Sequence, residues 1–181
     1  MAGAECTTER LALRRPTEAD LEAIWEVHAD PKTNQFNPAG PMATRDHARG
    51  MLDSWDSHWD RYGFGYWAVC ERGRPDRAIG FGGVMRKLVG EAEAFNLYFR
   101  FRPEVWGNGF AGEMGEAALA LAFDRIGAAQ VLGLVRPANE PSIRALVRLG
   151  MSPHGELDDV AGGPVSLIYA IDAAGWRERS R

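Results

Sequence analysis

Two spacings of apolar residues alternate along the chain and predict where its helices and strands lie. Apolar side chains fall at helical spacing over 21–28 and again over 48–59, with Thr17 and Thr44 placed to cap these two helices. Short apolar or alternating runs bounded by Gly, Pro or polar clusters predict strands. These runs cover residues 11–15, 66–71, 78–85, 94–101, 130–135 and 165–171.

The second half of the chain adds a strand–helix–strand unit. A glycine turn at 107–109 follows the strand at 94–101, and a helix is expected from there to about Ile126. A further helix is expected over 142–149, ended by Gly150. Loops are expected at 30–41, 88–90, 137–141 and 154–163. A strand, two helices, an antiparallel run and then a βαβ unit predict a mixed α+β fold in one piece.

Composition limits the classes of protein to consider. The 181 residues are enough for one domain with a sizeable core, and 45% of them are hydrophobic. A formal net charge of −4 argues against a general nucleic-acid binder. No apolar run approaches the ~18 residues of a membrane span, and no signal peptide is expected. Cys6 and Cys70 form no CxxC pair and no zinc spacing occurs, so we expect no metal and a cytoplasmic protein.

The glycine turn is the most informative local feature. Gly107 and Gly109 stand between a strand and a helix N-terminus, where backbone amides point at an anion. No GK[ST] follows, so the turn is not a Walker loop, and the antiparallel run before it argues against a dinucleotide-binding Rossmann unit. We therefore expect a phosphate site of another kind at this turn.

Five segments, in order, carry a likeness to a known family. They are residues 10–20, 63–69, 102–111, 139–144 with 149–151, and 167–170 with Trp176. Together they resemble the GNAT acetyltransferase superfamily and, within it, the RimJ/RimL-like branch. The likeness spans roughly residues 9–177, which implies a single acetyltransferase domain over 1–181. It also implies a mostly antiparallel sheet, flanked by helices and splayed between the strands at 94–101 and 130–135.

The resemblance also implies how acetyl-CoA binds. The cofactor lies in the splayed gap, and its pantetheine pairs with backbone near Phe99 and Phe101. Asn139 and Ser142 face it from the next element. The pyrophosphate meets the backbone of Val105, Trp106, Gly107, Asn108, Gly109, Phe110 and Ala111.

The usual acid and base of the family do not carry over. The strand position where family members often have glutamate is Asn96 here, and an asparagine takes no proton at neutral pH. The helix after Asn139 has Ala145, Leu146 and Val147 where many members have a tyrosine. The remaining catalytic candidates are Ser142 as an acid for the thiolate, and Glu93, Asp158 or their acidic neighbours Glu91 and Asp159 through a water relay.

Several other side chains have a structural interpretation that is preferred to a functional one. His28 is expected in the core or at its boundary, and Trp106 is expected to pack. Glu113 is expected to complement a helix dipole, and residues 156–159 to form a solvated loop. Trp55, Trp59 and Trp67 are expected in the core rather than on a substrate platform.

The sequence thus predicts an acetyl-CoA-dependent N-acetyltransferase that transfers directly to a primary amine, as a monomer or homodimer. An α-amine with pKa ~7.8 needs only ~1 kcal/mol to be neutral at pH 7, whereas a lysine amine at ~10.4 needs ~4.6 kcal/mol. A site without a strong base therefore favours a protein or peptide N-terminal α-amine. The alternatives are a small-molecule amine (a polyamine or an antibiotic) and a non-catalytic acetyl-CoA sensor.

Overall fold

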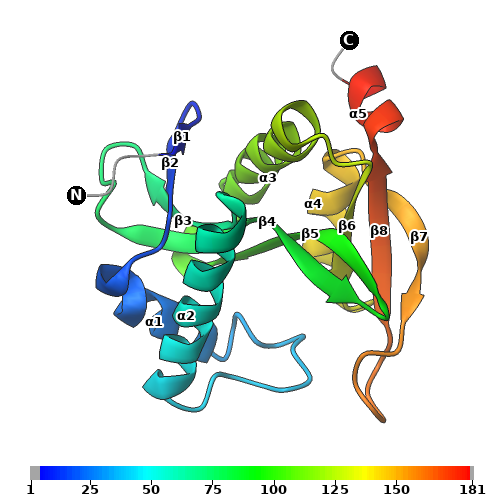
Figure 1. The fold of residues 1–181 in the computed structure, drawn as a ribbon. Coiled ribbons are helices and arrows are strands. Elements are labelled where there is room, and N and C mark those ends of the chain that lie inside the picture. Colours follow the sequence, from blue (N-terminus) through cyan, green and yellow to red (C-terminus); the bar gives the residue numbers. More distant parts are fainter. Residues whose placement is uncertain (1–4, 180–181) are drawn as a thin grey trace.

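The computed structural model describes residues 5–179, which contain one eight-stranded sheet with helices on both faces (Figure 1). The strands are β1 (Cys6–Thr7), β2 (Leu11–Arg14), β3 (Tyr66–Glu71), β4 (Ala78–Val89), β5 (Ala92–Phe101), β6 (Gln130–Val135), β7 (Ser152–Leu157) and β8 (Ser166–Asp172). The helices are α1 (Leu21–Ala29), α2 (Arg45–Tyr62), α3 (Phe110–Ala120), α4 (Glu140–Arg148) and α5 (Ala173–Arg179). The sheet order is β1-β2-β3-β4-β5-β6-β8-β7, and every pairing is antiparallel except β5 with β6.

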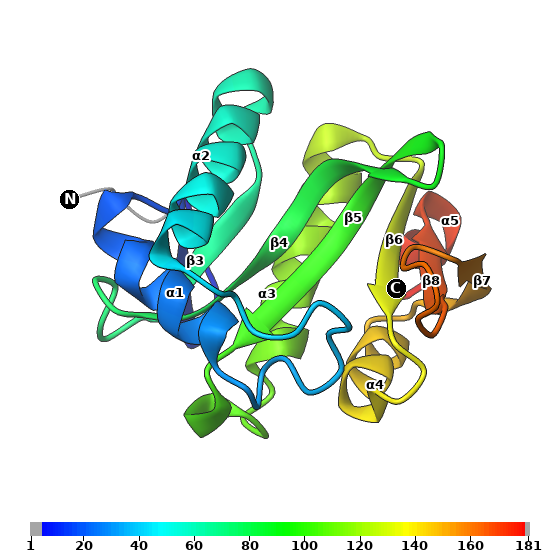
Figure 2. The same cartoon turned by 90° about the horizontal axis from the view of Figure 1, so that it is seen from below.

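Two hydrophobic clusters hold the helices to the sheet. One buries α1 and most of α2 against one face, and the other buries α3 against the opposite face (Figure 2). Side chains alternate along β5, as a strand requires. Leu97 and Phe101 belong to the α3 cluster, whereas Tyr98 packs with the α1 and α2 cluster. Even-numbered β5 side chains therefore face α1, and odd-numbered ones face α3.

The sheet is splayed where the sequence predicts. β5 and β6 run parallel but pair only over 95–97 and 131–133. Beyond Leu97 the two strands separate, as Figure 2 shows from below. The last residues of β5 therefore have a neighbour on the β4 side and none on the other.

A buried ion pair fixes the entry to α1. Arg14 and Asp20 form two hydrogen bonds of 2.7 Å while only 7% and 2% exposed. Asp20 also accepts from the Thr17 backbone N–H at 2.8 Å, so it caps the 3₁₀ turn η1 (Glu18–Asp20) that leads into α1. The predicted cap at Thr44 is confirmed, since its side chain accepts from the His47 N–H at the start of α2, whereas Thr17 caps η1 and Asp20 is the N-cap of α1.

Some elements differ from the sequence expectation. β4 continues to Val89 because its hairpin with β5 extends into solvent, where Leu88 is 69% exposed. Residues 154–163 are not all loop, because β7 pairs with β8 at the sheet edge. α4 begins at Glu140, before Ser142, and the expected helix to Ile126 ends in a π-helical turn, η3 (Leu121–Ile126). A 3₁₀ turn, η2 (Pro103–Val105), follows β5, and α5 was not predicted.

Among residues 5–179, no helix combines the length and the apolar character that crossing a bilayer requires.

Candidate active site

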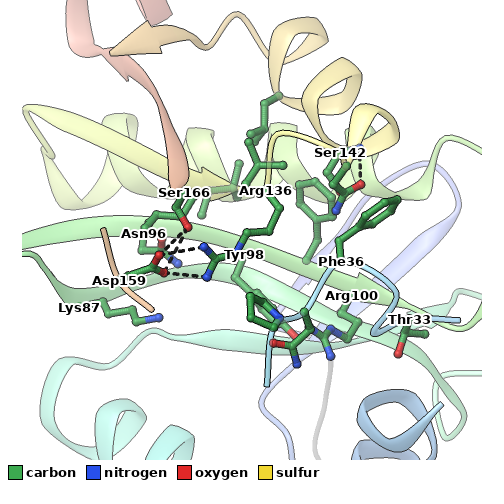
Figure 3. A pocket seen from close by; sticks show the side chains of 18 of the residues that line it. Thr33, Phe36, Lys87, Asn96, Tyr98, Arg100, Arg136, Ser142, Asp159 and Ser166 are labelled. Carbon is green, nitrogen blue, oxygen red and sulfur yellow. Dashed lines mark hydrogen bonds and ion pairs between the residues drawn. The ribbon is translucent and has the colours of Figure 1, made fainter. Parts of the chain in front are cut away.

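Three adjoining cavities lie in and beside the splayed gap. The loop cavity lies at the glycine turn, the central cavity lies along β5, and the side chamber opens between β5, α1 and α2. Phe99, Phe101, Asn139 and Ser142 line both the loop cavity and the central cavity. The central cavity and the side chamber share Asn37, Lys87, Asn96, Tyr98 and Arg100. The cleft is therefore continuous from the glycine turn to the side chamber, and Figure 3 shows its central part.

The glycine turn has the geometry of an anion cradle. Gly107 and Gly109 have φ of 80° and 78°, a left-handed conformation that glycine adopts without strain. Gly109 is the N-cap of α3, so the free amides of the first helical turn face the loop cavity. A Cβ built at Gly107 would meet nothing within 4 Å, so conformation rather than packing explains this glycine.

The turn is tied to the start of β2. Arg10 Nη1 donates to the Asn108 carbonyl at 2.9 Å, and Arg10 Nε pairs with Glu113 at 2.7 Å. Burial opposes ionisation of Glu113, but hydrogen bonds from Thr8 and Arg10 outweigh it and lower the pKa of this carboxyl. The helix-dipole interpretation of Glu113 is thus incomplete, because the side chain also anchors the loop.

The free edge of β5 presents backbone groups to the cleft. The Arg102 N–H donates to the Ile79 carbonyl at 2.9 Å, toward β4. Because backbone groups alternate along an antiparallel strand, Phe99 and Phe101 direct theirs to the opposite, open edge. The Trp106 indole N–H donates a hydrogen bond to the Phe101 carbonyl at 2.9 Å. The Phe99 N–H and C=O and the Phe101 N–H are left directed at the central cavity.

A hydrogen-bonded aromatic group forms the wall of the side chamber. Asn96 Nδ2 donates to the Tyr66 hydroxyl at 2.8 Å, with Asn96 only 5% exposed. His28 Nδ1 lies 2.8 Å from the Ile24 carbonyl, so Nδ1 carries the proton and Nε2 accepts from the Tyr98 hydroxyl at 2.8 Å. Burial, and then the charge of Arg100, lower the pKa of His28 to about 4. Burial raises the pKa of both tyrosines, so His28, Tyr66 and Tyr98 are uncharged at neutral pH.

Charge is distributed unevenly along the cleft. Arg136 pairs with Asp159 at 2.9 Å, and Ser166 donates to the same carboxylate at 3.1 Å (Figure 3). Arg100 donates to Asn34 Oδ1 at 2.8 Å. Within the described part of the chain, no aspartate or glutamate lines the side chamber.

Comparison with known proteins assigns the fold and the chemistry. A family model described as an acetyltransferase (GNAT) domain matches residues 10–152. The chain belongs to this family. It is therefore an acetyltransferase, and its acyl donor is acetyl-CoA. A relative, the uncharacterized N-acetyltransferase YoaA of Bacillus subtilis (strain 168), is 26% identical over 152 residues, or 83% of this chain and 84% of that protein.

Solved structures share the architecture. A GNAT-family acetyltransferase from Bacillus anthracis superposes with a TM-score of 0.76 at 23% identity, covering 93% of this chain and 98% of that one. The aminoglycoside acetyltransferase AAC(6')-Ib, solved in complex with coenzyme A, gives a TM-score of 0.75 at 14% identity, covering 94% and 99%. The predicted GNAT-like α+β fold with a splayed sheet is confirmed.

The predicted cofactor residues of the acetyltransferase gather around one groove. The loop cavity is lined by Val105, Trp106, Gly107, Gly109, Phe110, Ala111, Phe99, Phe101, Asn139 and Ser142. Asn108 is not among the lining side chains, and its amide donates to the Val105 carbonyl at 3.0 Å. Asn139 Oδ1 accepts from the Ser142 N–H at 3.2 Å, so Asn139 also caps α4. Their contact with the cofactor stays a prediction, which the groove accommodates.

The catalytic candidates lie in different places. Ser142 lines both the loop cavity and the central cavity. Asp158 and Glu93 line none of the three cavities, and Glu93 pairs with Arg86 at 3.0 Å. Asp159, the neighbour of Asp158, does line the central cavity.

The tryptophans separate in the structure. Trp55 is buried but also lines the side chamber, whereas Trp59 and Trp67 belong to the α3 cluster. The packing expected for Trp106 is wrong, since this side chain is 45% exposed and is held by its indole hydrogen bond. His28 is buried, as expected, yet it also lines the chamber.

Sequence reasoning missed two residues of the chamber, Tyr98 and Arg100. They share a face of β5 with Asn96, so the period of two along this strand was the signal that identifies them. Asn96 itself was located because it precedes the Arg102-Pro103 pair at a fixed spacing.

Proposed function

We propose that this acetyltransferase transfers the acetyl group directly to a primary amine held in the side chamber, and that the acceptor is an N-terminal α-amine. On this proposal the chain falls in the RimJ/RimL-like branch. The observation that carries it is the carboxylate-free side chamber, which adjoins the central cavity along the free edge of β5. Its volume of about 730 Å³ suits an amine substituent of peptide or metabolite size.

The groove supplies binding and orientation. The amides at the N-terminus of α3 and in the glycine turn are proposed to bind the pyrophosphate. The open backbone groups of Phe99 and Phe101 are proposed to pair with the pantetheine amides, as an added strand would. A bound acetyl-CoA presents a thioester carbonyl, an electrophile whose oxygen becomes negative during attack. A backbone N–H on the open edge of β5 is the proposed donor to that oxygen.

The chamber disfavours cations, and this replaces a strong base. The same surroundings, burial and then the charge of Arg100, lower the pKa of His28 to about 4. Burial acts in the same direction on a bound amine, and no carboxylate of the chamber counteracts it. An α-amine with pKa ~7.8 needs ~1 kcal/mol to be neutral at pH 7, which partial burial supplies, whereas a lysine amine needs ~4.6 kcal/mol.

The wall can orient the neutral amine. The Tyr98 hydroxyl donates to His28, so its oxygen remains free to accept a hydrogen bond from an amine N–H. Asn96 donates to Tyr66, which leaves its Oδ1 as a second acceptor near the same place. We propose that these two groups aim the amine lone pair at the thioester, and that the proton then leaves to solvent.

Of the catalytic candidates, Ser142 is retained as a donor to the leaving thiolate. Its position between the loop cavity and the central cavity supports this role. A thiolate with pKa ~8.5 needs little assistance, so Ser142 is expected to contribute modestly. For the water relay, Asp159 is a better candidate than Asp158 or Glu93, because it lines the central cavity.

The small-molecule alternative has support from fold neighbours alone. Two structural neighbours are an aminoglycoside acetyltransferase and a spermidine N-acetyltransferase chimera, at 14% and 17% identity. Such polycations are bound most readily by carboxylates, and none lines the side chamber within residues 5–179. The free thiols Cys6 and Cys70 fit the proposed cytoplasmic location.

Two peptides test the acceptor class. They share one sequence with a single lysine, and in one the α-amine is blocked while in the other the lysine is blocked. We expect thiol release at pH 7 to be at least ~10-fold faster with the free α-amine, given the ~3.6 kcal/mol difference in the cost of neutralising the two amines. Faster acetylation of the lysine would refute the α-amine assignment. A protein that binds acetyl-CoA but acetylates neither peptide would move the search to metabolite amines.

A further inference from the structure

Arg100 differs from the other arginines of this protein. Among the described arginines that are not exposed, it alone has no carboxylate partner; Arg14, Arg15, Arg49, Arg86, Arg102 and Arg136 all form ion pairs. Its side chain lines both the central cavity and the side chamber (Figure 3). An arginine that is partly removed from water without a counter-ion is costly, and an anion in the cavity would offset that cost.

The guanidinium is held in place by a built support. Arg100 Nη1 donates to Asn34 Oδ1 at 2.8 Å, and Asn34 is only 5% exposed. The Asn34 amide donates in turn to the His28 and Asp30 carbonyls at 2.8 Å each and to Thr33 Oγ1 at 3.1 Å. These bonds fix which way the Asn34 oxygen points. A guanidinium has five N–H donors, so most of those of Arg100 are available to a ligand.

From this geometry we infer that the acceptor carries both an amine and a carboxylate. Arg100 binds this carboxylate, which lies a few bonds from the reacting amine. The inference rests on the proposed function and names its substrate class. Tyr98 and Arg100 are two residues apart on one face of β5, which places their Cα atoms about 6.6 Å apart. The amine at Tyr98 and the carboxylate at Arg100 thus belong to a single small acceptor, such as an N-terminal glutamate residue.

The rest of the chamber agrees with an anionic group. No carboxylate of the described residues lines it to repel the ligand, and Asp159 in the central cavity is already paired with Arg136. Lys87 also lines the chamber, but Figure 3 shows it well apart from Arg100 along the cavity. Arginine binds a carboxylate with two parallel hydrogen bonds, so Arg100 recognises the carboxylate specifically and Lys87 only adds positive charge.

Peptides that differ only in the first side chain test the inference. Three C-terminally amidated peptides begin with Glu, Gln or Lys, so that a side-chain carboxylate is present in only one of them. We expect the wild type to show a kcat/KM for the Glu peptide about 10-fold above that for the Gln peptide, with the Lys peptide and spermidine lower still. Equal or higher rates with Gln, Lys or spermidine would overturn the inference.

Variants assign the preference to Arg100. In Arg100→Gln the preference for Glu over Gln should collapse to within about 2-fold, mainly through KM, and Arg100→Lys should retain part of it. Arg177→Gln removes an exposed cation that lines none of the three cavities and should leave the preference unchanged. If Arg100→Gln and Arg100→Lys both slow the Glu and Gln peptides equally, Arg100 is only structural and the inference is wrong.

A binding measurement separates this inference from the proposed function. Calorimetry with the Glu peptide, in the presence of coenzyme A, should show binding that Arg100→Gln weakens about 10-fold. Turnover of other amines but not of the Glu peptide would overturn the inference and leave the acetyltransferase intact. Binding of the Glu peptide without turnover of any amine would support the anion subsite while contradicting the proposed transfer to an α-amine. Thermal melts confirm that each variant is folded.

Discussion

Replacing Gly107 by alanine isolates the contribution of the glycine turn to acetyl-CoA binding. Gly107 has φ of 80°, and a Cβ built there meets nothing within 4 Å, so the substitution causes no collision. Its cost is the conformational penalty of a left-handed L-residue, about 1–2 kcal/mol. If the bound phosphate requires this conformation, the KM for acetyl-CoA should rise about 5- to 30-fold. The turn is remote from the reacting carbonyl, so kcat should change little.

The assay combines thiol release at varied acetyl-CoA with calorimetric titration of coenzyme A. The matched control is Gly50→Ala in α2, where a Cβ also meets nothing within 4 Å and the backbone is helical. That change should stabilise the fold by about 0.5–1 kcal/mol and leave the KM unaltered. A Gly107→Ala protein that melts at a lower temperature but binds coenzyme A as tightly as the wild type would show that the turn does not bind the phosphates.

Two further predictions concern stability. Asp20→Ala leaves the buried Arg14 without its partner, and urea unfolding should show a loss of about 3–5 kcal/mol; a loss below ~1 kcal/mol would mean that Arg14 finds another acceptor. The pKa of His28 is lowered to about 4 from an unfolded value of 6.5, so the unfolded chain binds the extra proton and stability falls as pH drops from 6.5 toward 4. That decrease amounts to about 3 kcal/mol, His28→Gln should largely remove it, and an unchanged pH dependence of unfolding in His28→Gln would refute the assignment.

Strands with clear boundaries in the sequence were predictable, and the edge strand β7 was not. β3 and β6 begin and end where the sequence predicts, because glycines or polar residues bound short apolar runs. Residues 154–157 of β7 were predicted as loop because no apolar alternation marks this strand, five of whose six residues are exposed. Only its pairing with β8 makes it a strand. Pairing with a distant segment does not alter the local spacing of apolar residues, which explains why β7 was not predicted.

The glycine turn and the side chamber also differ in how far the sequence predicts them. The glycine turn is a local structure, since a strand, two glycines and a helix start follow one another in sequence. The side chamber is assembled from α1, α2, β3, β4, β5 and the 30–43 loop, which are far apart in the chain. Tyr98 hydrogen-bonds to His28, and Arg100 hydrogen-bonds to Asn34. Both hydrogen bonds depend on the packing of α1 and the loop after it on the sheet, which the sequence does not show.

The proposed function gives a physical reason for asparagine at position 96. A glutamate there would form an ion pair with the acceptor, raise the pKa of its amine and hold it in the unreactive ammonium form. Asn96 instead gives one N–H to Tyr66 and keeps an oxygen for the neutral amine. An α-amine loses little by this exchange, because only ~1 kcal/mol separates it from the neutral form at pH 7. A lysine acceptor would still need most of its ~4.6 kcal/mol. On the proposed function, Asn96 therefore favours weakly basic amines. The acceptor's carboxylate would be neutralised by Arg100, with no acidic side chain near the nucleophile.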